Sequence, residues 1–278
     1  MTDGLPTPPD PSAEAGGVGP SSGRLPIVFI GHGNPMYAIV PNRYAEAWAA
    51  LGAELPRPRA VLCVSAHWFV PGLGVTAMAR PRTIHDFGGF PPELFEVSYP
   101  APGDPGLADR VRSLLDPLEV VADTSWGLDH GTWSVLRHVY PHADVPVVQL
   151  SIDARKEPAY HAEVGHRLAP LRDEGVLIVG SGNVAHNLRM AQFGEGVGAF
   201  EWAARFQADV RARIEAGDDA SLVSYRDLGE DARLAIPTPD HYVPLLYVLG
   251  ARHPHDVARF PVEGIDAGSL SMLSVVLG

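Results

Sequence analysis

The sequence predicts an α/β fold, in which a central, mostly parallel or mixed sheet is flanked by helices within a single domain. The first observation is a set of short, continuous apolar runs, which are typical of strands buried on both faces. The runs are 25–30, 60–66, 145–151 and 175–180. The second observation is that helical patterns lie between and after these runs. They cover 43–53, 105–117, 132–139, 157–172, 199–216 and 241–250. Strands that alternate with helices favour a layered domain with right-handed crossovers.

Taken in chain order, the elements begin with a tail. Residues 1–24 are rich in Pro, Gly and Ser and lack the basic and apolar regions of a signal peptide, so we expect a disordered tail before one folded domain over 25–278. The segment 80–104 has many Pro, Gly and aromatic residues and no clear period. A loop of that length in a compact domain is often functional, so we expect a lid or a pocket wall.

Composition excludes several classes of protein. Apolar residues make up 46% of the 278 residues, which indicates a globular chain. The formal net charge is −12 and we find no Lys/Arg cluster, so we expect no nucleic-acid partner. No apolar run is long enough to span a bilayer, so we expect no membrane association. Cys63 is the only cysteine, which excludes an internal disulfide and a cysteine-based zinc site and fits a cytoplasmic location.

Histidines follow three of the predicted strands. His32 follows the strand over 25–30, His67 follows 60–66, and His186 follows 175–180 through GSGNVAH. Ligands in open α/β sheets bind beyond the carboxyl ends of the strands. We therefore expect these three side chains, which are distant in the sequence, to converge.

Two further histidines lie near helix starts. Thr238 suits an N-cap and Pro239 the first helical position, which places His241 in the first turn of a helix. The helix dipole disfavours imidazolium there, and neutral imidazole is the form that binds metal. His130 precedes another predicted helix, where it could donate to a substrate oxygen. A simple capping or turn role is the alternative for each of them.

The remaining histidines have a weaker case. His85 lies in the long loop. Six others are expected at the surface: His138, His142, His161, His166, His253 and His255. The stretch GSGNVAHN lacks both the dinucleotide fingerprint and the P-loop lysine, and no G-x-S-x-G elbow is present. A nucleotide site and a serine nucleophile are therefore not expected.

Seven stretches of the chain together resemble the class III extradiol ring-cleavage dioxygenases, in particular the 4,5-DOPA dioxygenase extradiol-like branch. In order they read GHGNPM (31–36), SAHW (65–68), TIHDFGGFPPELFEVSYPAPG (83–103), LDHGTWSVL (128–136), PVVQLSID (146–153), GSGNVAHNL (180–188) and TPDHYVPLLY (238–247). They extend from about residue 25 to 250. The resemblance implies a catalytic α/β dioxygenase-like domain over 25–278 that opens a catechol ring with O₂ at a non-haem metal.

The resemblance also implies a site. His32, His67 and His241 would be the metal ligands, with Fe(II) for activity and Zn²⁺ as an ion that the isolated protein could hold. Three histidines depart from the two-His, one-carboxylate pattern of the wider class and are also a common catalytic zinc arrangement. His186 matches the acid/base histidine of the class and is a candidate fourth ligand. His130 resembles its substrate-orienting histidine.

The substrate pocket is expected in the long loop, where His85 and Phe90 would contact the ring, since an aromatic lining suits a flat substrate. We expect a small-molecule catechol and O₂ as partners, and a homodimer as the assembly. Two other functions stay open. One is a zinc-dependent hydrolase that uses the three histidines, and the other is a non-enzymatic binder of a metal or small molecule.

Overall fold

The computed structural model describes residues 23–194 and 196–278. The predicted tail over 1–24 lies outside the described residues, apart from its last two. The first strand that follows, β1, is Ile27–Gly31. The remaining strands are β2 Ala60–Val70, β3 Leu73–Thr76, β4 Val120–Asp123, β5 Val147–Asp153, β6 Val176–Gly182, β7 Ala258–Val262, β8 Ile265–Asp266, β9 Leu270–Ser271 and β10 Ser274–Leu277.

The main sheet has eight strands in the order β4-β3-β5-β2-β6-β1-β10-β7. The pairs β5–β2, β2–β6, β6–β1 and β3–β4 are parallel, whereas β3–β5, β1–β10 and β10–β7 are antiparallel. The sheet is therefore mixed, with a parallel centre, as expected. All four predicted strands lie side by side in that centre, because their continuous apolar sequence suits positions covered on both faces.

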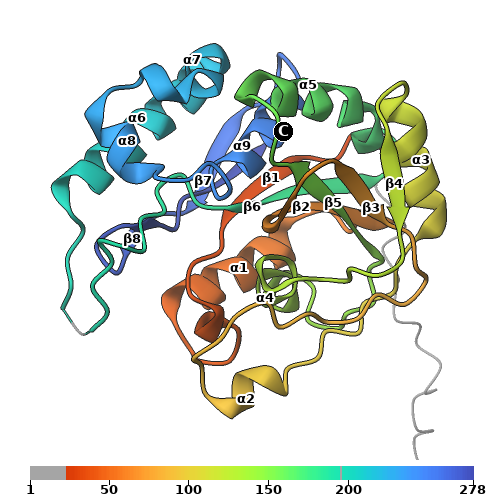
Figure 1. The fold of residues 1–278 in the computed structure, drawn as a ribbon, viewed down its shortest axis with the longest axis horizontal. Coiled ribbons are helices and arrows are strands. Elements are labelled where there is room, and N and C mark those ends of the chain that lie inside the picture. Colours follow the sequence, from red (N-terminus) through yellow and green to blue (C-terminus); the bar gives the residue numbers. More distant parts are fainter. Residues whose placement is uncertain (1–22, 195) are drawn as a thin grey trace, which may run out of the picture.

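The helices lie on both sides of this sheet (Figure 1). The α-helices are α1 Arg43–Glu54, α2 Pro92–Phe95, α3 Pro105–Leu115, α4 His130–Val139, α5 Pro158–Leu168, α6 Glu201–Ala216, α7 Asp219–Val223, α8 Glu230–Ala235 and α9 Val243–Gly250. Short 3₁₀ helices are η1 Pro35–Ala38, η2 Ala169–Arg172 and η3 Tyr225–Asp227.

Alternate residues of the central strands face opposite layers. In β1, Ile27 and Phe29 belong to the apolar cluster that includes α3, α5, α6 and α9. Val28 and Ile30 belong to a second cluster, which α1 and α4 complete on the other face. Two packed interfaces around one sheet account for the burial of every residue in β1.

Several predicted boundaries differ from the structure. β2 continues past residue 66 to Val70, with an irregularity in its pairing to β5 between Val64 and Phe69. His67 therefore lies at an irregular point inside a strand rather than after its end. The last helix begins at Val243, so His241 belongs to the turn before it and not to its first turn. Within the described ranges, none of the helices combines the length and the apolar character that crossing a bilayer requires.

Candidate metal centre

The carboxyl end of the parallel centre gathers the predicted histidines. β2, β6 and β1 are adjacent and parallel, so they end at the same edge of the sheet. His32 directly follows β1, and its backbone N–H donates to Gly182 O at 3.1 Å. His67 comes from β2, and His186 comes four residues after β6. The expected convergence at strand ends is present, although His67 reaches it from inside its strand.

His241 comes to the same place from the turn before α9. Asn183 N donates to His241 O at 2.8 Å, which joins this turn to the end of β6. A Cβ atom at Gly182 would collide with that carbonyl oxygen, so only glycine permits the close approach. Gly182, the second glycine of GSGN, therefore permits close backbone packing at the site.

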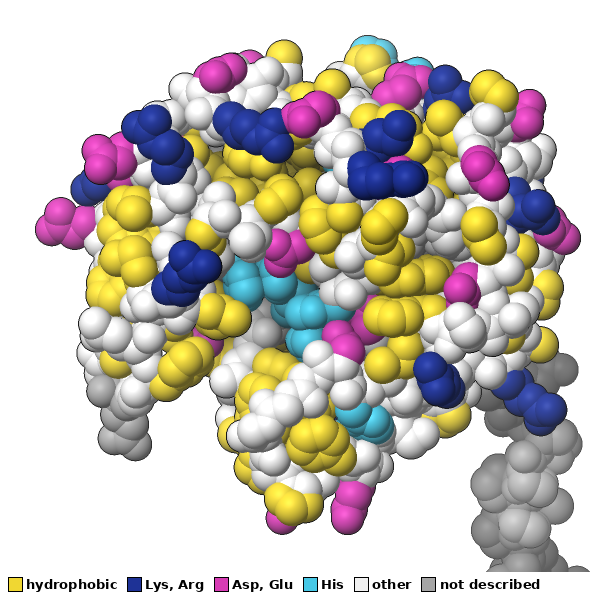
Figure 2. All heavy atoms as spheres, in the orientation of Figure 1, with side chains coloured by type: hydrophobic (Ala, Val, Ile, Leu, Met, Phe, Trp, Pro, Cys, Tyr) yellow, Lys and Arg dark blue, Asp and Glu magenta, His cyan; other side chains and the backbone are white. Residues whose placement is uncertain are grey.

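The histidines lie at the floor of a hollow in one face of the molecule (Figure 2). The cavity has a volume of about 210 Å³. Its described lining residues are His32, Gly33, Asn34, Pro35, His67, Phe87, Phe90, His130, His186, Leu188, Phe193, His241 and Leu270. A cavity of about 620 Å³ lies elsewhere, between Trp68 and Tyr160, but its described lining contains no histidine or cysteine. We therefore take the smaller cavity as the site.

Three of the rings could hold one metal ion. One nitrogen from each of His32, His67 and His241 lies within 4.8 Å of the other two. The Nε2 atoms of His32 and His67 are 3.1 Å apart. The ring centroids of the three residues are separated by 5.0 to 5.2 Å. Such a compact all-nitrogen set suits a first-row divalent cation.

Hydrogen bonds set the orientation of His32. Ser181 Oγ donates its proton to Gly131 O at 2.6 Å and lies 3.1 Å from His32 Nδ1. Because the hydroxyl proton is already used, Oγ accepts from the Nδ1–H group of His32. The lone pair of neutral His32 is then on Nε2, which is the nitrogen that faces His67.

Carboxylates contact the outer nitrogens of the other two rings. Asp240 Oδ2 makes a short contact with His241 Nδ1, so Nε2 is the nitrogen that His241 has free. Asp86 Oδ2 lies 3.5 Å from His67 Nδ1. Carboxylate contacts to the far nitrogen are common among metal-binding histidines, because they fix the tautomer and raise its basicity. The side chain of Asp240 thus lies against the ring that follows it in the sequence.

Burial keeps the rings of His32 and His67 in the neutral form. The pKa of His32 is lowered well below its usual value, first by burial and then by His241 and the other nearby rings. The pKa of His67 is lowered in the same way, by burial and then by His130. Deprotonated imidazole is the form required for coordination, so the electrostatics of the cavity favour a cation over protons.

His186 is placed differently from the other three. Its ring stacks on His241 with centroids 3.4 Å apart and planes 8° from parallel. One ring nitrogen of His186 lies within 4.8 Å of possible ligand atoms of Asp240 and His241. His186 does not belong to the group formed by His32, His67 and His241. Burial and His241 lower the pKa of His186 to about 2, so the ring is neutral at pH 7.

His130 is the first residue of α4 and lines the same cavity. Asp129 caps this helix by accepting from Thr132 N at 3.1 Å, and Ser65 Oγ donates to the same carboxylate at 2.7 Å. The cap thereby ties α4 to β2. The ring of His130 lies 3.8 Å from the ring of His67, centroid to centroid.

The long loop contributes only part of the predicted pocket wall. Phe87 and Phe90 line the cavity, and their rings are in edge contact with centroids 5.3 Å apart. The described lining does not include His85. Its Nε2 lies 3.0 Å from Val97 O, and its ring packs against Phe87, so its contacts are those of loop packing. The structure therefore does not bring His85 into the described cavity lining.

One histidine that was predicted to lie at the surface is buried in the structure. His161 is 1% exposed, and its Nδ1 lies 3.1 Å from Tyr247 OH, between α5 and α9. Its position on the inner face of an amphipathic helix was the overlooked signal.

Sequence reasoning missed three residues that contact the site: Ser181, Asp86 and Asp240 as a partner of His241. Ser181 and Asp240 are close in sequence to predicted site residues, since Ser181 lies five positions before His186 and Asp240 lies one before His241. Asp86 follows His85 in the loop, but no local pattern indicates which of several acidic loop residues will reach the cavity.

Comparisons with known proteins agree with this geometry. Residues 28–265 match the family model described as the catalytic LigB subunit of aromatic ring-opening dioxygenase. The chain is 52% identical over 262 residues to a 4,5-DOPA dioxygenase extradiol of Escherichia coli strain K12, covering 93% of this chain and 96% of that protein. It is 36% identical over 251 residues to the Beta vulgaris protein of the same name, covering 87% and 92%. The crystal structure of an uncharacterized Escherichia coli K12 protein superposes with a TM-score of 0.81 at 47% identity, covering 92% of this chain and all of that one.

Proposed function

The chain belongs to the family of the catalytic LigB subunit of aromatic ring-opening dioxygenases, and we propose that it works at a metal ion held by His32, His67 and His241. It is an extradiol dioxygenase, an oxidoreductase that acts on aromatic rings. The observation that carries the metal assignment is the meeting of three ring nitrogens within 4.8 Å, each ring contacted on its other nitrogen by Ser181, Asp86 or Asp240.

We propose Fe(II) as the ion that supports turnover and Zn²⁺ as an ion that the isolated protein can hold. Bound Fe(II) would supply the positive charge and the redox chemistry that ring opening by O₂ requires, whereas Zn²⁺ has no accessible redox state. The protein itself supplies an all-nitrogen donor set in which His32 and His241 are buried and His67 is partly buried.

His186 is the proposed proton acceptor for a substrate hydroxyl. It lines the cavity, and it stacks on His241 instead of joining the three-ring set. A neutral imidazole beside the reacting oxygen can take the hydroxyl proton and later return it to the product. This arrangement supports the acid/base role over that of a fourth ligand.

His130, Phe87 and Phe90 are the proposed substrate contacts. The edges of the two phenylalanines and the ring of His130 form one wall of the cavity, where Phe87 lies 5.3 Å from His130 between centroids. An aromatic wall suits a flat ring, and a cavity of about 210 Å³ suits a single-ring substrate. Because the named relatives are 4,5-DOPA dioxygenases, DOPA is the catechol that we propose to test first.

The decisive experiment combines anaerobic metal loading with oxygen uptake. Metal-free protein is loaded with Fe(II) or with Zn²⁺ and then mixed with DOPA, dopamine or 3,4-dihydroxyphenylacetate in air-saturated buffer. We expect the Fe(II) protein to consume O₂ and form a yellow ring-opened product, and the Zn²⁺ protein to do neither. An Fe(II) protein that consumes no O₂ with any catechol, while the Zn²⁺ protein hydrolyses an ester or amide, would establish the hydrolase alternative instead.

Assembly and location stay predictions. A homodimer is the expected assembly, and its test is the mass measured by light scattering after gel filtration. A cytoplasmic location is expected from the cysteine usage alone, and its test is fractionation of the native cells.

A further inference from the structure

The carboxylate of Asp86 lies between two histidine rings. Its Oδ2 atom is 3.5 Å from His67 Nδ1 and 3.0 Å from His130 Nδ1. Its Oδ1 atom accepts a hydrogen bond of 2.9 Å from the backbone N–H of His130. The two rings also contact each other, with centroids 3.8 Å apart. One side chain therefore touches a ring of the proposed metal set and a ring of the substrate wall.

Other polar contacts do not compete for these two nitrogens. In the part of the chain that the structure describes, His130 Nδ1 has no well-aligned hydrogen bond, and Asp86 at ion-pair distance is its polar neighbour. The same carboxylate is the polar neighbour of His67 Nδ1. Without Asp86, both buried nitrogens would lose the group that selects their tautomer.

Asp86 is itself well held. The backbone N–H that it accepts from belongs to the first residue of α4, where the helix dipole favours a negative charge. Oδ1 is occupied by this hydrogen bond, so Oδ2 is the atom left for the two Nδ1 nitrogens, and each ring has its Nε2 free of the carboxylate.

We propose that Asp86 is a positioning residue shared by His67 and His130, which fixes the metal-binding ring and the substrate-facing ring relative to each other. The expected effect on metal binding depends only on the contact of Asp86 with His67. The expected effect on substrate binding rests on the proposed function, because that function assigns His130 to the substrate wall. With Nδ1 directed at Asp86, His130 leaves Nε2 as the ring nitrogen that is available to a substrate hydroxyl.

The test uses D86A, D86N, H130A and the double variant D86A/H130A. D104N is the matched control, because Asp104 also accepts a backbone N–H at a helix start, from Leu107 of α3, and does not line the cavity. The first readout is Co²⁺ binding to metal-free protein, followed by its visible absorption. We expect D86A to weaken Co²⁺ binding by about 10- to 100-fold, D86N by less, and H130A and D104N not at all.

The second readout is the binding of 4-nitrocatechol to the Co²⁺-saturated proteins, followed by the colour change of the ligand. We expect D86A and H130A to weaken it by similar factors, and the double variant to be no weaker than H130A alone, because Asp86 acts on the substrate through His130. D86N should be intermediate, since an amide retains one acceptor oxygen where the carboxylate has two.

Native Co²⁺ affinity in D86A, or losses of 4-nitrocatechol affinity that simply add in the double variant, would overturn the proposal. If D86A does not fold, as judged by thermal melting of the metal-free protein, D86N decides by the same criteria. Neither readout requires ring opening. A protein that passes both tests but consumes no O₂ would therefore contradict the proposed function and leave the role of Asp86 standing.

Discussion

His32 and His67 direct their Nε2 atoms at each other across 3.1 Å, although the two residues come from different strands of the sheet. Each ring is contacted on its Nδ1 side, by Ser181 and by Asp86. Two buried acceptor atoms at this distance are stabilised by a shared cation, and His241 completes the set. This relationship is the basis of the predictions below for the ligand histidines and for Ser181.

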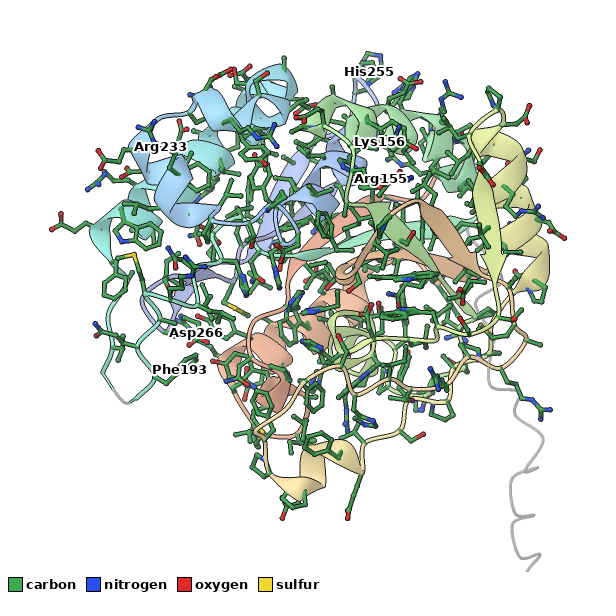
Figure 3. All side chains as sticks on the ribbon, in the orientation of Figure 1. Arg155, Lys156, Phe193, Arg233, His255 and Asp266 are labelled. Carbon is green, nitrogen blue, oxygen red and sulfur yellow. The ribbon has the colours of Figure 1, made fainter. Side chains whose placement is uncertain are left out.

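Replacement of a proposed ligand should abolish metal retention. We expect H32A and H67A to lose the metal that the parent protein retains through gel filtration, because two histidines hold a divalent ion far more weakly than three. Metal content per chain, measured by mass spectrometry of the eluted protein, checks this. H255A is the control, since His255 is exposed and lies far from Phe193 at the cavity mouth (Figure 3). Stoichiometric metal in either ligand variant would refute the assignment.

Replacement of His186 should separate chemistry from metal binding. We expect H186A to lower the rate of ring opening by about 100- to 10,000-fold, the usual contribution of a general acid–base group, while metal affinity changes little. Steady-state kinetics with Fe(II)-loaded protein and Co²⁺ titration of the metal-free protein measure the two effects. Equal losses in both would make His186 a ligand.

The hydroxyl of Ser181 should matter for metal affinity beyond its part in stability. In S181A, His32 loses the acceptor for its Nδ1–H, so we expect metal binding to weaken by about 10-fold or more. S151A is a close control, because Ser151 is also buried and makes two backbone hydrogen bonds, with Gly72 O and Gly74 N. Both variants should lose about 1–3 kcal/mol of unfolding free energy. Only S181A should lose metal affinity; equal metal affinity in the two would contradict the orienting role.

Burial of His161 should make the metal-free protein sensitive to mild acid. Burial lowers the pKa of His161 from 6.5 to about 4, so between these values the unfolded chain binds a proton that the folded chain does not. The contribution of His161 to the free energy of unfolding is therefore fully present above pH 6.5 and is lost as the pH falls toward 4. From pH 7.5 to 5, we expect the parent protein to lose about 2 kcal/mol more than H161Q. Urea unfolding in EDTA at the two pH values measures this difference, and parallel losses would show that His161 titrates normally when folded.

A buried ion pair should stabilise the segment that leads into β1. Arg172 pairs with Asp256 at 2.6 Å, and the guanidinium also donates to Leu25 O and Ala251 O. In D256A the buried guanidinium loses its counter-charge, so we expect a loss of about 3–5 kcal/mol. D144A breaks the exposed pair of Asp144 with Arg57 and should cost no more than about 1 kcal/mol. Similar urea midpoints for the two variants would contradict this reading.

The centre of the fold was predictable because its sequence signal is local. The strands over 25–30 and 175–180 agree with β1 and β6 to within two residues, since continuous apolar runs have few other uses in a globular chain. The outer strands were not predictable. β4 has two exposed residues among four, and β10 is a four-residue run, so neither has a period long enough to separate a strand from a loop.

The site was predictable where function and strand end coincide. His32 and His186 follow strands, and the rule that ligands bind at carboxyl ends brought them together correctly. Asp86 was not predictable, because its contacts with His67 and His130 depend on the path of an irregular loop. The direction of the His85 side chain was equally unpredictable. His85 is adjacent to Asp86 in the sequence, yet its Nε2 atom lies against Val97 O. Loop residues follow no regular period, so the sequence does not indicate in which direction their side chains point.

The position of β1 in the sheet has a consequence for biosynthesis. Its neighbours are β6 and β10, and Gly31 N donates to Ser274 Oγ across 243 residues of chain. A nascent polypeptide on the ribosome cannot complete either edge of β1 until most of the protein has been translated. Folding around such distant pairings is slow, and the exposed strand is vulnerable to aggregation meanwhile. Capture of the metal by His32 is therefore expected to follow release of the chain, and a chain that stops before Ser274 should depend on chaperones and remain metal-free.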